Sequence, residues 1–180
     1  MKLPIETRSL LLRHAVPDDA GELFVLSQEA QYRTWLPSQL YDDEAHAGRS
    51  LEYLIDQYSN PGNPRLGPYV LLIEHKADRI VIGHVGFSRF DDDVEIGFAI
   101  AERYQRRGLA TEAIVAASRW AFATFGLERI LGLADAENIA SRRTLVRAGF
   151  AYLEDKVMTF QGSDKAVSVH ALSANSILES

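Results

Sequence analysis

The chain has 180 residues, of which 47% are hydrophobic and 24% are charged. This composition fits a single globular domain with a sizeable core and excludes general disorder. The formal net charge of −6, from 19 Lys and Arg against 25 Asp and Glu, argues against a nucleic-acid partner, which would need a basic surface. The absence of cysteine excludes a disulfide scaffold, a cysteine-ligated zinc site and a cysteine nucleophile.

Two further classes are disfavoured by what the sequence lacks. No apolar run approaches the roughly 18 residues of a membrane-spanning helix, and residues 1–6 lack the apolar segment of a signal peptide. We therefore expect a cytoplasmic protein with no membrane partner. We also expect no metal, because the histidines show no metal-ligand spacing; they are His14, His46, His75, His84 and His170.

The first half of the chain predicts one strand followed by two helices. Three adjacent leucines predict the strand over residues 9–16. A Pro-Asp-Asp helix-start signal then predicts a helix over 18–27, and residues 31–40 read as irregular. The second helix begins at the acidic run 42–44 and carries apolar residues at helical spacing, until the Pro- and Gly-rich run 60–64 ends it.

The second half predicts six more strands and two helices. Residues 69–74, 80–90 and 94–100 should form an antiparallel meander. A long helix follows over 108–125, with Gly126 placed where a helix C-cap belongs. The chain then predicts a strand, a helix and two closing strands, over 130–134, 138–148, 150–156 and 167–173. The expected fold class is mixed α/β (α+β), with one domain over 1–180 and a central, mostly antiparallel sheet with helices on both faces.

The most informative segment is the basic, glycine-containing turn that opens the helix at residue 108. A helix N-terminus presents unpaired N–H groups and partial positive charge, and Gly108 lets the backbone approach a ligand closely. Arg106 and Arg107 add full charges, and Thr111 adds a hydroxyl. A pyrophosphate suits such a turn; the alternative is a plain helix start with solvated arginines. The turn matches neither a Walker P-loop nor a dinucleotide fingerprint.

With its flanks, this segment resembles the acetyl-CoA signature of the GNAT superfamily of N-acetyltransferases. That signature, Gln/Arg-x-x-Gly-x-Gly/Ala, stands here as Gln105-Arg106-Arg107-Gly108-Leu109-Ala110. A second landmark is similar to the family's Asn-x-x-Ser…Gly-Phe run, and it comprises Asn138, Ser141, Gly149 and Phe150. Residues 6–13 and 95–98 resemble the branch that contains the ribosomal-protein N-terminal acetyltransferases (Rim type). The resemblance covers nearly the whole chain.

The resemblance implies acetyl-CoA as co-substrate, held between two splayed strands. Its pyrophosphate would lie on the turn, mostly on backbone N–H groups of Gln105, Arg106, Arg107, Gly108, Leu109, Ala110 and Thr111. Its pantetheine arm would pair with the main chain at Phe98, Ala99 and Ile100. Asn138 would bind the cofactor arm, and Arg143 would either reach a phosphate or remain a solvated helix residue.

The resemblance also implies the catalytic groups. Glu95 matches the family's frequent carboxylate base, which takes a proton from the attacking amine; the alternative is an outward-facing strand residue. Many members place a tyrosine acid seven residues after the Asn, but that position is Leu145 here. Ser141 would substitute, either as proton donor or only as a residue of the helix's first turn. The expected mechanism is direct attack in a ternary complex, with a strand N–H near Phe98 or Ala99 stabilising the oxyanion.

The acceptor side would be formed by the first two helices and one strand of the meander. Tyr32, Trp35, His84 and Phe90 are candidates to line it, with core packing as the alternative for each. The branch favours a protein or peptide N-terminal α-amine over a small amine such as an antibiotic, amino acid or polyamine. Residues 42–44 hint at an acidic cleft but are equally explained as helix capping. A non-catalytic CoA-binding domain and a purely structural fold remain alternatives, and a homodimer is possible because dimers are common in the family.

Overall fold

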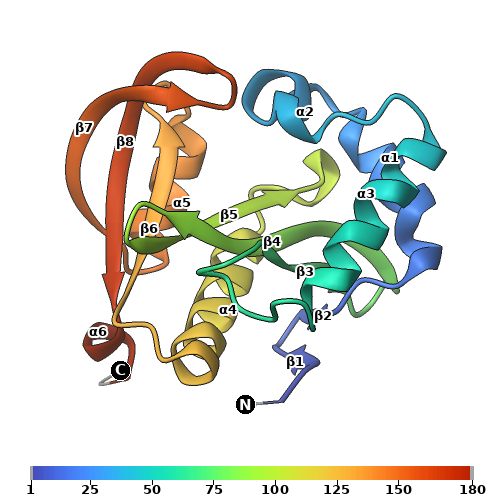
Figure 1. The fold of residues 1–180 in the computed structure, drawn as a ribbon, viewed down its shortest axis with the longest axis horizontal. Helices are drawn as coiled ribbons and strands as arrows, with labels where there is room; N and C mark the ends of the chain where they lie inside the picture. The colour runs from blue at the N-terminus through green and yellow to red at the C-terminus, as the bar shows by residue number, and fades with distance from the viewer. Residues whose placement is uncertain (1, 179–180) are drawn as a thin grey trace.

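The computed structural model describes residues 2–178 and places eight strands in one sheet, in the order β1-β2-β3-β4-β5-β6-β8-β7 (Figure 1). The strands are β1 Ile5–Glu6, β2 Leu10–Arg13, β3 Tyr69–His75, β4 Ile80–Phe90, β5 Asp93–Ile100, β6 Arg129–Asp135, β7 Ala151–Phe160 and β8 Ser163–Ser173. Neighbouring strands pair antiparallel except β5 and β6, which pair parallel. The predicted mixed, mostly antiparallel sheet is confirmed.

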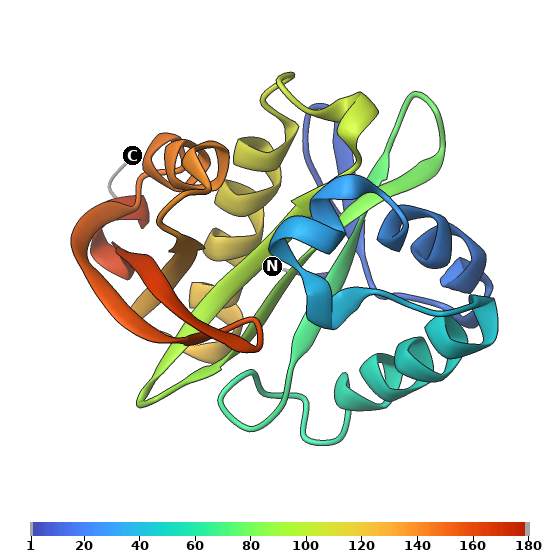
Figure 2. The same cartoon turned by 90° about the horizontal axis from the view of Figure 1, so that it is seen from above.

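Helices cover both faces of this sheet, as Figure 2 shows: α4 and α5 lie on one side, and α1, α2 and α3 on the other. The α-helices are α1 Ala20–Ser27, α2 Ala30–Trp35, α3 Glu44–Gln57, α4 Leu109–Phe125, α5 Ile139–Arg147 and α6 Ala174–Leu178. Three short 3₁₀ turns join them, η1 Pro17–Asp19, η2 Pro37–Gln39 and η3 Glu102–Tyr104. The long helix begins at Gly108 and ends at Gly126, both in the left-handed region, as the sequence predicted.

The central strand β4 shows how the fold separates its core from its functional face. Alternate side chains of a strand point to opposite faces. Phe87 is buried toward α4, where its ring lies 6.5 Å from that of Trp120. His84, Gly86 and Ser88 therefore point to the opposite face, which α1 and α3 partly cover. The apolar core thus fixes which residues of β4 can meet a ligand.

Two predictions about the elements were wrong. Residues 31–40, expected to be irregular, contain most of α2 and all of η2. The closing strands are longer than predicted because they pair with each other along a hairpin whose outer strand, β7, is largely exposed. Exposed strands carry polar side chains and so lack the apolar run that signals a strand.

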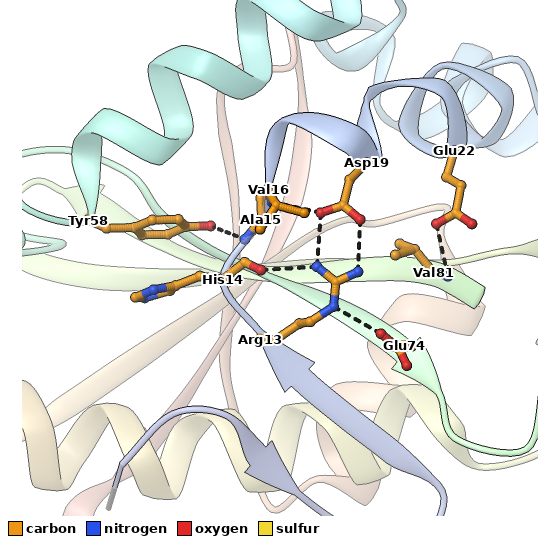
Figure 3. A network of polar contacts seen from close by, with 9 residues as sticks. All are labelled: Arg13, His14, Ala15, Val16, Asp19, Glu22, Tyr58, Glu74 and Val81. Carbon is orange, nitrogen blue, oxygen red and sulfur yellow. Dashed lines mark hydrogen bonds and ion pairs between the residues drawn. The ribbon is translucent and has the colours of Figure 1, made fainter. Parts of the chain in front are cut away.

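One partly buried ion pair fixes the corner where β2 meets η1 and α1 (Figure 3). The Arg13 guanidinium donates to both carboxylate oxygens of Asp19, at 2.8 and 2.9 Å. It also donates to the Glu74 carboxylate on β3 and to the His14 carbonyl. Asp19 is 5% exposed, and it also accepts the Val16 N–H at 2.8 Å. These carboxylates raise the pKa of Arg13. The Pro-Asp-Asp signal predicted an aspartate cap at this helix start, and the Asp19 carboxylate does accept the Val16 N–H while it also binds Arg13.

Neutral hydrogen bonds complete the same corner. The Tyr58 hydroxyl accepts the Ala15 N–H and donates to the Val70 carbonyl, which joins α3's end to β3. Glu22 of α1 accepts the Val81 N–H at 3.2 Å. The helices that form one wall of the cleft described below are therefore anchored to the sheet by polar contacts as well as by packing.

Replacing Asp19 by alanine is expected to lower the free energy of unfolding by about 3 kcal/mol, because it leaves the partly buried Arg13 without its main partner. Urea unfolding at pH 7 measures this. The double change Arg13→Met with Asp19→Leu should recover most of the loss. Glu6→Ala, which breaks the exposed pair with Lys76, serves as control and should leave stability unchanged within error. Equal losses in Asp19→Ala and Glu6→Ala would contradict the assigned role.

Candidate active site

The two parallel strands separate halfway along their length, and this opens a gap in the sheet. β5 and β6 pair at three positions that end with Ile96 opposite Gly132. β5 then continues to Ile100 and β6 to Asp135 without further pairing between them in the described chain. Beyond Ile96, β5 therefore keeps β4 on one side but lacks a neighbouring strand on the side that faced β6. The resemblance predicted such splayed strands for the thioester arm.

The end of β5 shows which backbone groups face this gap. The Ile100 carbonyl accepts side-chain amides of Gln31 at 2.9 Å and Gln105 at 3.1 Å, so it points away from β4. The next residue, Ala101, donates its N–H to the Ile82 carbonyl of β4 at 2.7 Å. Successive residues thus alternate between the gap and β4, as they do in any strand.

This alternation separates the three residues predicted to pair with the pantetheine arm. Phe98 turns its N–H and carbonyl toward the gap, whereas Ala99 turns its own toward β4. Ile100 also faces the gap, but its carbonyl is already occupied by the two glutamine amides. Phe98 is therefore the residue whose main chain best fits a ligand that replaces the missing strand.

The predicted anion-binding turn leads directly into α4. Gly108 has φ +80° and Arg106 has φ +61°, so the backbone here folds back sharply to aim the first N–H groups of α4 outward. A Cβ atom on Gly108 would meet nothing within 4 Å, which marks an open surface. Gln105, Arg106, Gly108, Leu109, Ala110 and Thr111 line the cleft. Arg107 lies outside this lining, with its guanidinium 5.1 Å from the Tyr104 ring centre.

Glu95 lies next to the last paired position of β5 and lines the cleft. Burial raises the pKa of its carboxyl above the ordinary value, and a hydrogen bond from the Ser88 hydroxyl, at 3.2 Å, partly opposes this rise. Ser88 lies directly opposite Glu95 on β4. A half-buried carboxyl with a raised pKa at the inner end of the gap has the properties of a general base.

Two glycines keep the floor of the cleft open beside this carboxyl. Gly86 of β4 and Gly97 of β5 lie directly opposite each other, on the face that also carries Glu95 and His84. Both line the cleft, and a Cβ on Gly97 would meet nothing within 4 Å. The whole cleft has a volume of about 1480 Å³ and reaches from the predicted anion-binding turn before α4 to the surface of α3.

The other wall of the gap is the beginning of α5. Asn138 caps this helix, because its side-chain oxygen accepts the Ser141 N–H at 3.0 Å. Asn138, Ser141 and Arg143 all line the cleft. Leu145, at the position where many members carry a tyrosine acid, is fully buried and packs against Gly132.

The four predicted acceptor residues do not gather in one place. Trp35 and His84 line the cleft, and burial lowers the pKa of His84 to about 4, so that this side chain is neutral at pH 7. Tyr32 is buried behind His84, with ring centres 6.4 Å apart, and lies outside the cleft lining. Phe90 packs against a small second core formed around Leu133 and also lies outside the lining.

Several cleft residues were missed from the sequence. Gly86, Ser88 and Gly97 take their positions from the register of the β4–β5 hairpin, and the predicted meander implied this hairpin but not its register. Arg147 follows Arg143 by one helical turn and lines the same wall. No sequence pattern indicated that Gln31 lines the cleft, because it lies in a segment that was expected to be irregular.

Comparisons with known proteins agree with this geometry. Residues 9–151 match the model of the acetyltransferase (GNAT) domain family. The uncharacterized N-acetyltransferase YoaA of Bacillus subtilis is 26% identical over 149 residues, which is 81% of each chain. Two solved structures share the fold: the ribosomal-protein α-N-acetyltransferase RimL with coenzyme A (TM-score 0.79, 16% identity, 97% of this chain and 98% of that one), and the microcin C7 self-immunity acetyltransferase MccE with acetyl-CoA and AMP (TM-score 0.78, 16% identity, 96% and 99%).

The chain belongs to the GNAT acetyltransferase family, and it is an N-acetyltransferase whose co-substrate is acetyl-CoA. The cleft fits that molecule: an open, glycine-containing turn at a helix N-terminus suits its phosphates, and the gap beyond Ile96 suits its extended arm. Among the described residues, none of the helices combines the length and the apolarity that crossing a membrane requires.

Replacing Gly108 by tryptophan is expected to weaken acetyl-CoA binding at least tenfold, because an indole would occupy the open surface of the turn. Calorimetric titration measures the affinity. Gly126→Trp is the matched control: Gly126 also has a positive φ, at the other end of the same helix, and a Cβ there meets nothing within 4 Å. Both changes impose similar backbone strain, but only the first should reduce affinity. Equal affinities in the two variants would contradict the placement of the turn.

Proposed function

We propose that residues 1–180 act as one domain that moves the acetyl group of acetyl-CoA to a primary amine by direct attack in a ternary complex, and that a peptide or protein N-terminal α-amine is the favoured acceptor. One observation carries the proposal: the half-buried Glu95 carboxyl lines the cleft where β5 and β6 begin to separate. Acetyl-CoA, when bound, supplies an acetyl thioester activated toward amines. The residues of the chain supply the proton transfers and the orientation.

Glu95 is the proposed base. An amine attacks only as the neutral species, and a lysine-type amine with a pKa near 10.4 is almost wholly protonated at pH 7. An α-amine, with a pKa of roughly 8, gives up its proton more readily. A carboxylate whose pKa is raised by burial accepts that proton better than an exposed one. The N–H of Phe98, which faces the gap, is the proposed main-chain donor for the negative charge that develops on the acetyl oxygen.

Ser141 is the proposed donor to the departing sulfur. Its N–H is already used by Asn138, so its hydroxyl is the group that it can offer to the cleft. The demand on this donor is modest, because a thiol has a pKa of about 8.5 and leaves readily as thiolate. The fully buried Leu145 cannot take this role.

The charges around the acceptor side support an acceptor that is not polycationic. The acidic residues 42–44 do not line the cleft; Asp43 instead caps α3 through the His46 N–H at 2.6 Å. The charged side chain that α3 does contribute to the lining is Arg49. A polyamine or aminoglycoside would meet this cation and few carboxylates. A peptide N-terminus, with one positive charge and an uncharged backbone behind it, suits the groove better.

A panel of acceptors tests this preference. Short peptides with free N-termini, the same peptides with a blocked N-terminus and one lysine, spermidine and an aminoglycoside would be compared by release of CoA thiol, which is clean because the chain has no cysteine. The proposal predicts the highest kcat/KM for the free N-terminal peptides. Preference for spermidine or the aminoglycoside would overturn the acceptor assignment. Acetyl-CoA binding with no thiol release for any amine would favour a non-catalytic binding domain.

The pH profile of kcat/KM, measured with the best acceptor of that panel, tests Glu95. Activity should fall as the pH drops through the raised pKa of Glu95, because the protonated carboxyl cannot act as a base. Glu95→Gln should lower kcat about 10²-fold or more while leaving acetyl-CoA affinity intact. Ser88→Ala removes the hydrogen bond that favours the carboxylate, so the acidic limb should move to higher pH.

Ser50→Ala provides the control for that shift, because Ser50 also lines the cleft but belongs to α3. The acidic limb of the kcat/KM profile of Ser50→Ala should coincide with that of the unmodified protein. An unchanged limb in Ser88→Ala, or full activity in Glu95→Gln, would remove Glu95 from the mechanism.

A further inference from the structure

We propose that Gln31 is a positioning residue for acetyl transfer: together with Gln105 it fixes the acceptor-side helix α2 to the turn that precedes α4, so that each supports the other. This inference rests on the proposed function, because it assigns the turn to acetyl-CoA and α2 to the acceptor side. It arises from a hydrogen-bonded cluster that joins two segments about 70 residues apart. The cluster comprises Glu29, Gln31, Ile100, Glu102 and Gln105.

Two glutamates in this cluster cap each other's helices. Glu29, the residue before α2, accepts the N–H of Glu102 at 3.0 Å and so caps η3. Glu102, the first residue of η3, accepts the N–H of Gln31 at 3.2 Å and so caps α2. Helix N-termini leave N–H groups that need such acceptors. Neither segment satisfies its first turn alone, and each completes the other.

Two glutamine amides then close the cluster. The Gln31 amide donates to Glu29 at 2.8 Å and to the Ile100 carbonyl at 2.9 Å, while its oxygen accepts from Gln105 at 2.8 Å. The second hydrogen of the Gln105 amide is donated to the same Ile100 carbonyl, at 3.1 Å. All four amide hydrogens are therefore used. The side chain of Gln105, the first residue of the acetyl-CoA signature, points at α2 and at β5.

Both tied segments need outside support. α2 has six residues, far fewer than a helix requires to be stable by itself. The turn after η3 holds Arg106 in the left-handed region, where residues other than glycine are disfavoured. Trp35 lies one helical turn beyond Gln31, and both line the cleft. A loss at Gln31 should therefore loosen the acceptor wall and the phosphate turn together.

The cluster also predicts which side chains position 105 can accept. Gln105 acts there only as a donor, toward the oxygens of Gln31 and Ile100. Arginine offers several donors and no acceptor, so it can replace these contacts. Glutamate offers only acceptors and would face two oxygens and the nearby carboxylates. This is a physical reason for the Gln/Arg alternation at the first position of the signature.

The test compares four variants by acetyl-CoA calorimetry and by acrylamide quenching of tryptophan fluorescence. Trp120 is buried in the core, so a change in quenching reports on Trp35 and the acceptor wall. Gln31→Leu should weaken acetyl-CoA about tenfold, although Gln31 lies on α2 and not on the turn, and it should make Trp35 more accessible. Gln105→Ala and Gln105→Glu should each match or exceed that loss. Gln105→Arg should bind at least threefold more tightly than Gln105→Ala.

Gln28→Leu is the matched control, because Gln28 ties α1 to the Tyr41 carbonyl at 2.8 Å and touches no part of the turn. A merely structural role for Gln31 would lower the melting temperature of Gln31→Leu and Gln28→Leu alike and leave both affinities unchanged; that result would overturn the proposal. If Gln31→Leu fails to fold, the three Gln105 variants decide, and equal affinities of Arg, Ala and Glu would overturn it. Failure of the unmodified protein to bind acetyl-CoA would instead refute the assignment of the turn.

Discussion

The separation of β5 from β6 is the constraint on which the rest of the molecule depends. Buried peptide groups need hydrogen-bond partners, and a sheet normally supplies them from the next strand. Beyond Ile96 and Gly132 that strand is withdrawn, and the neighbouring elements are arranged around the vacated edge. The turn before α4 stands at one end of the gap and Glu95 at the other. A ligand with a phosphate at one end and an extended, amide-containing arm fits this arrangement.

The distribution of charge explains how an acidic chain can receive a strongly anionic co-substrate. The net charge is −6, but three of the four arginines that line the cleft, Arg106, Arg143 and Arg147, stand on the turn and on α5; the fourth, Arg49, stands on α3. Glu95 lies on β5, in a more buried setting that raises its pKa. In the proposed complex, the cationic side chains of the turn and α5 would face the phosphates, while the carboxyl would face the amine. Segregating the two avoids neutralising the base with a nearby arginine.

Much of this organisation could be predicted from the sequence because it is encoded locally. Apolar periodicity, acidic helix starts and the glycines at both ends of α4 located most elements, and both signature runs supplied residues that line the cleft. The predictions that were wrong concern features that depend on contacts between segments distant in the sequence. α2 was missed because its first turn is capped by Glu102, some 70 residues away. Phe90 was misplaced because its packing partners, around Leu133, belong to β6 and the closing strands.

The acceptor side of the cleft was also hard to predict from the sequence. The sequence around Gln31 contains no motif that predicts a functional role for it. The proposed positioning role follows only from its contacts with Ile100 and Gln105, which the fold brings beside it. The acidic run at 42–44 suggested a cationic acceptor, but capping α3 accounts for Asp43 and the run lies outside the cleft. Short polar segments of this kind obtain their function from tertiary structure.

The central claim is that the gap between β5 and β6, with the turn before α4, is a binding site for acetyl-CoA. Calorimetric titration of acetyl-CoA into the purified protein tests it most directly. The account predicts saturable binding with one molecule per chain. The absence of binding at millimolar acetyl-CoA would contradict it and would require another occupant for the gap.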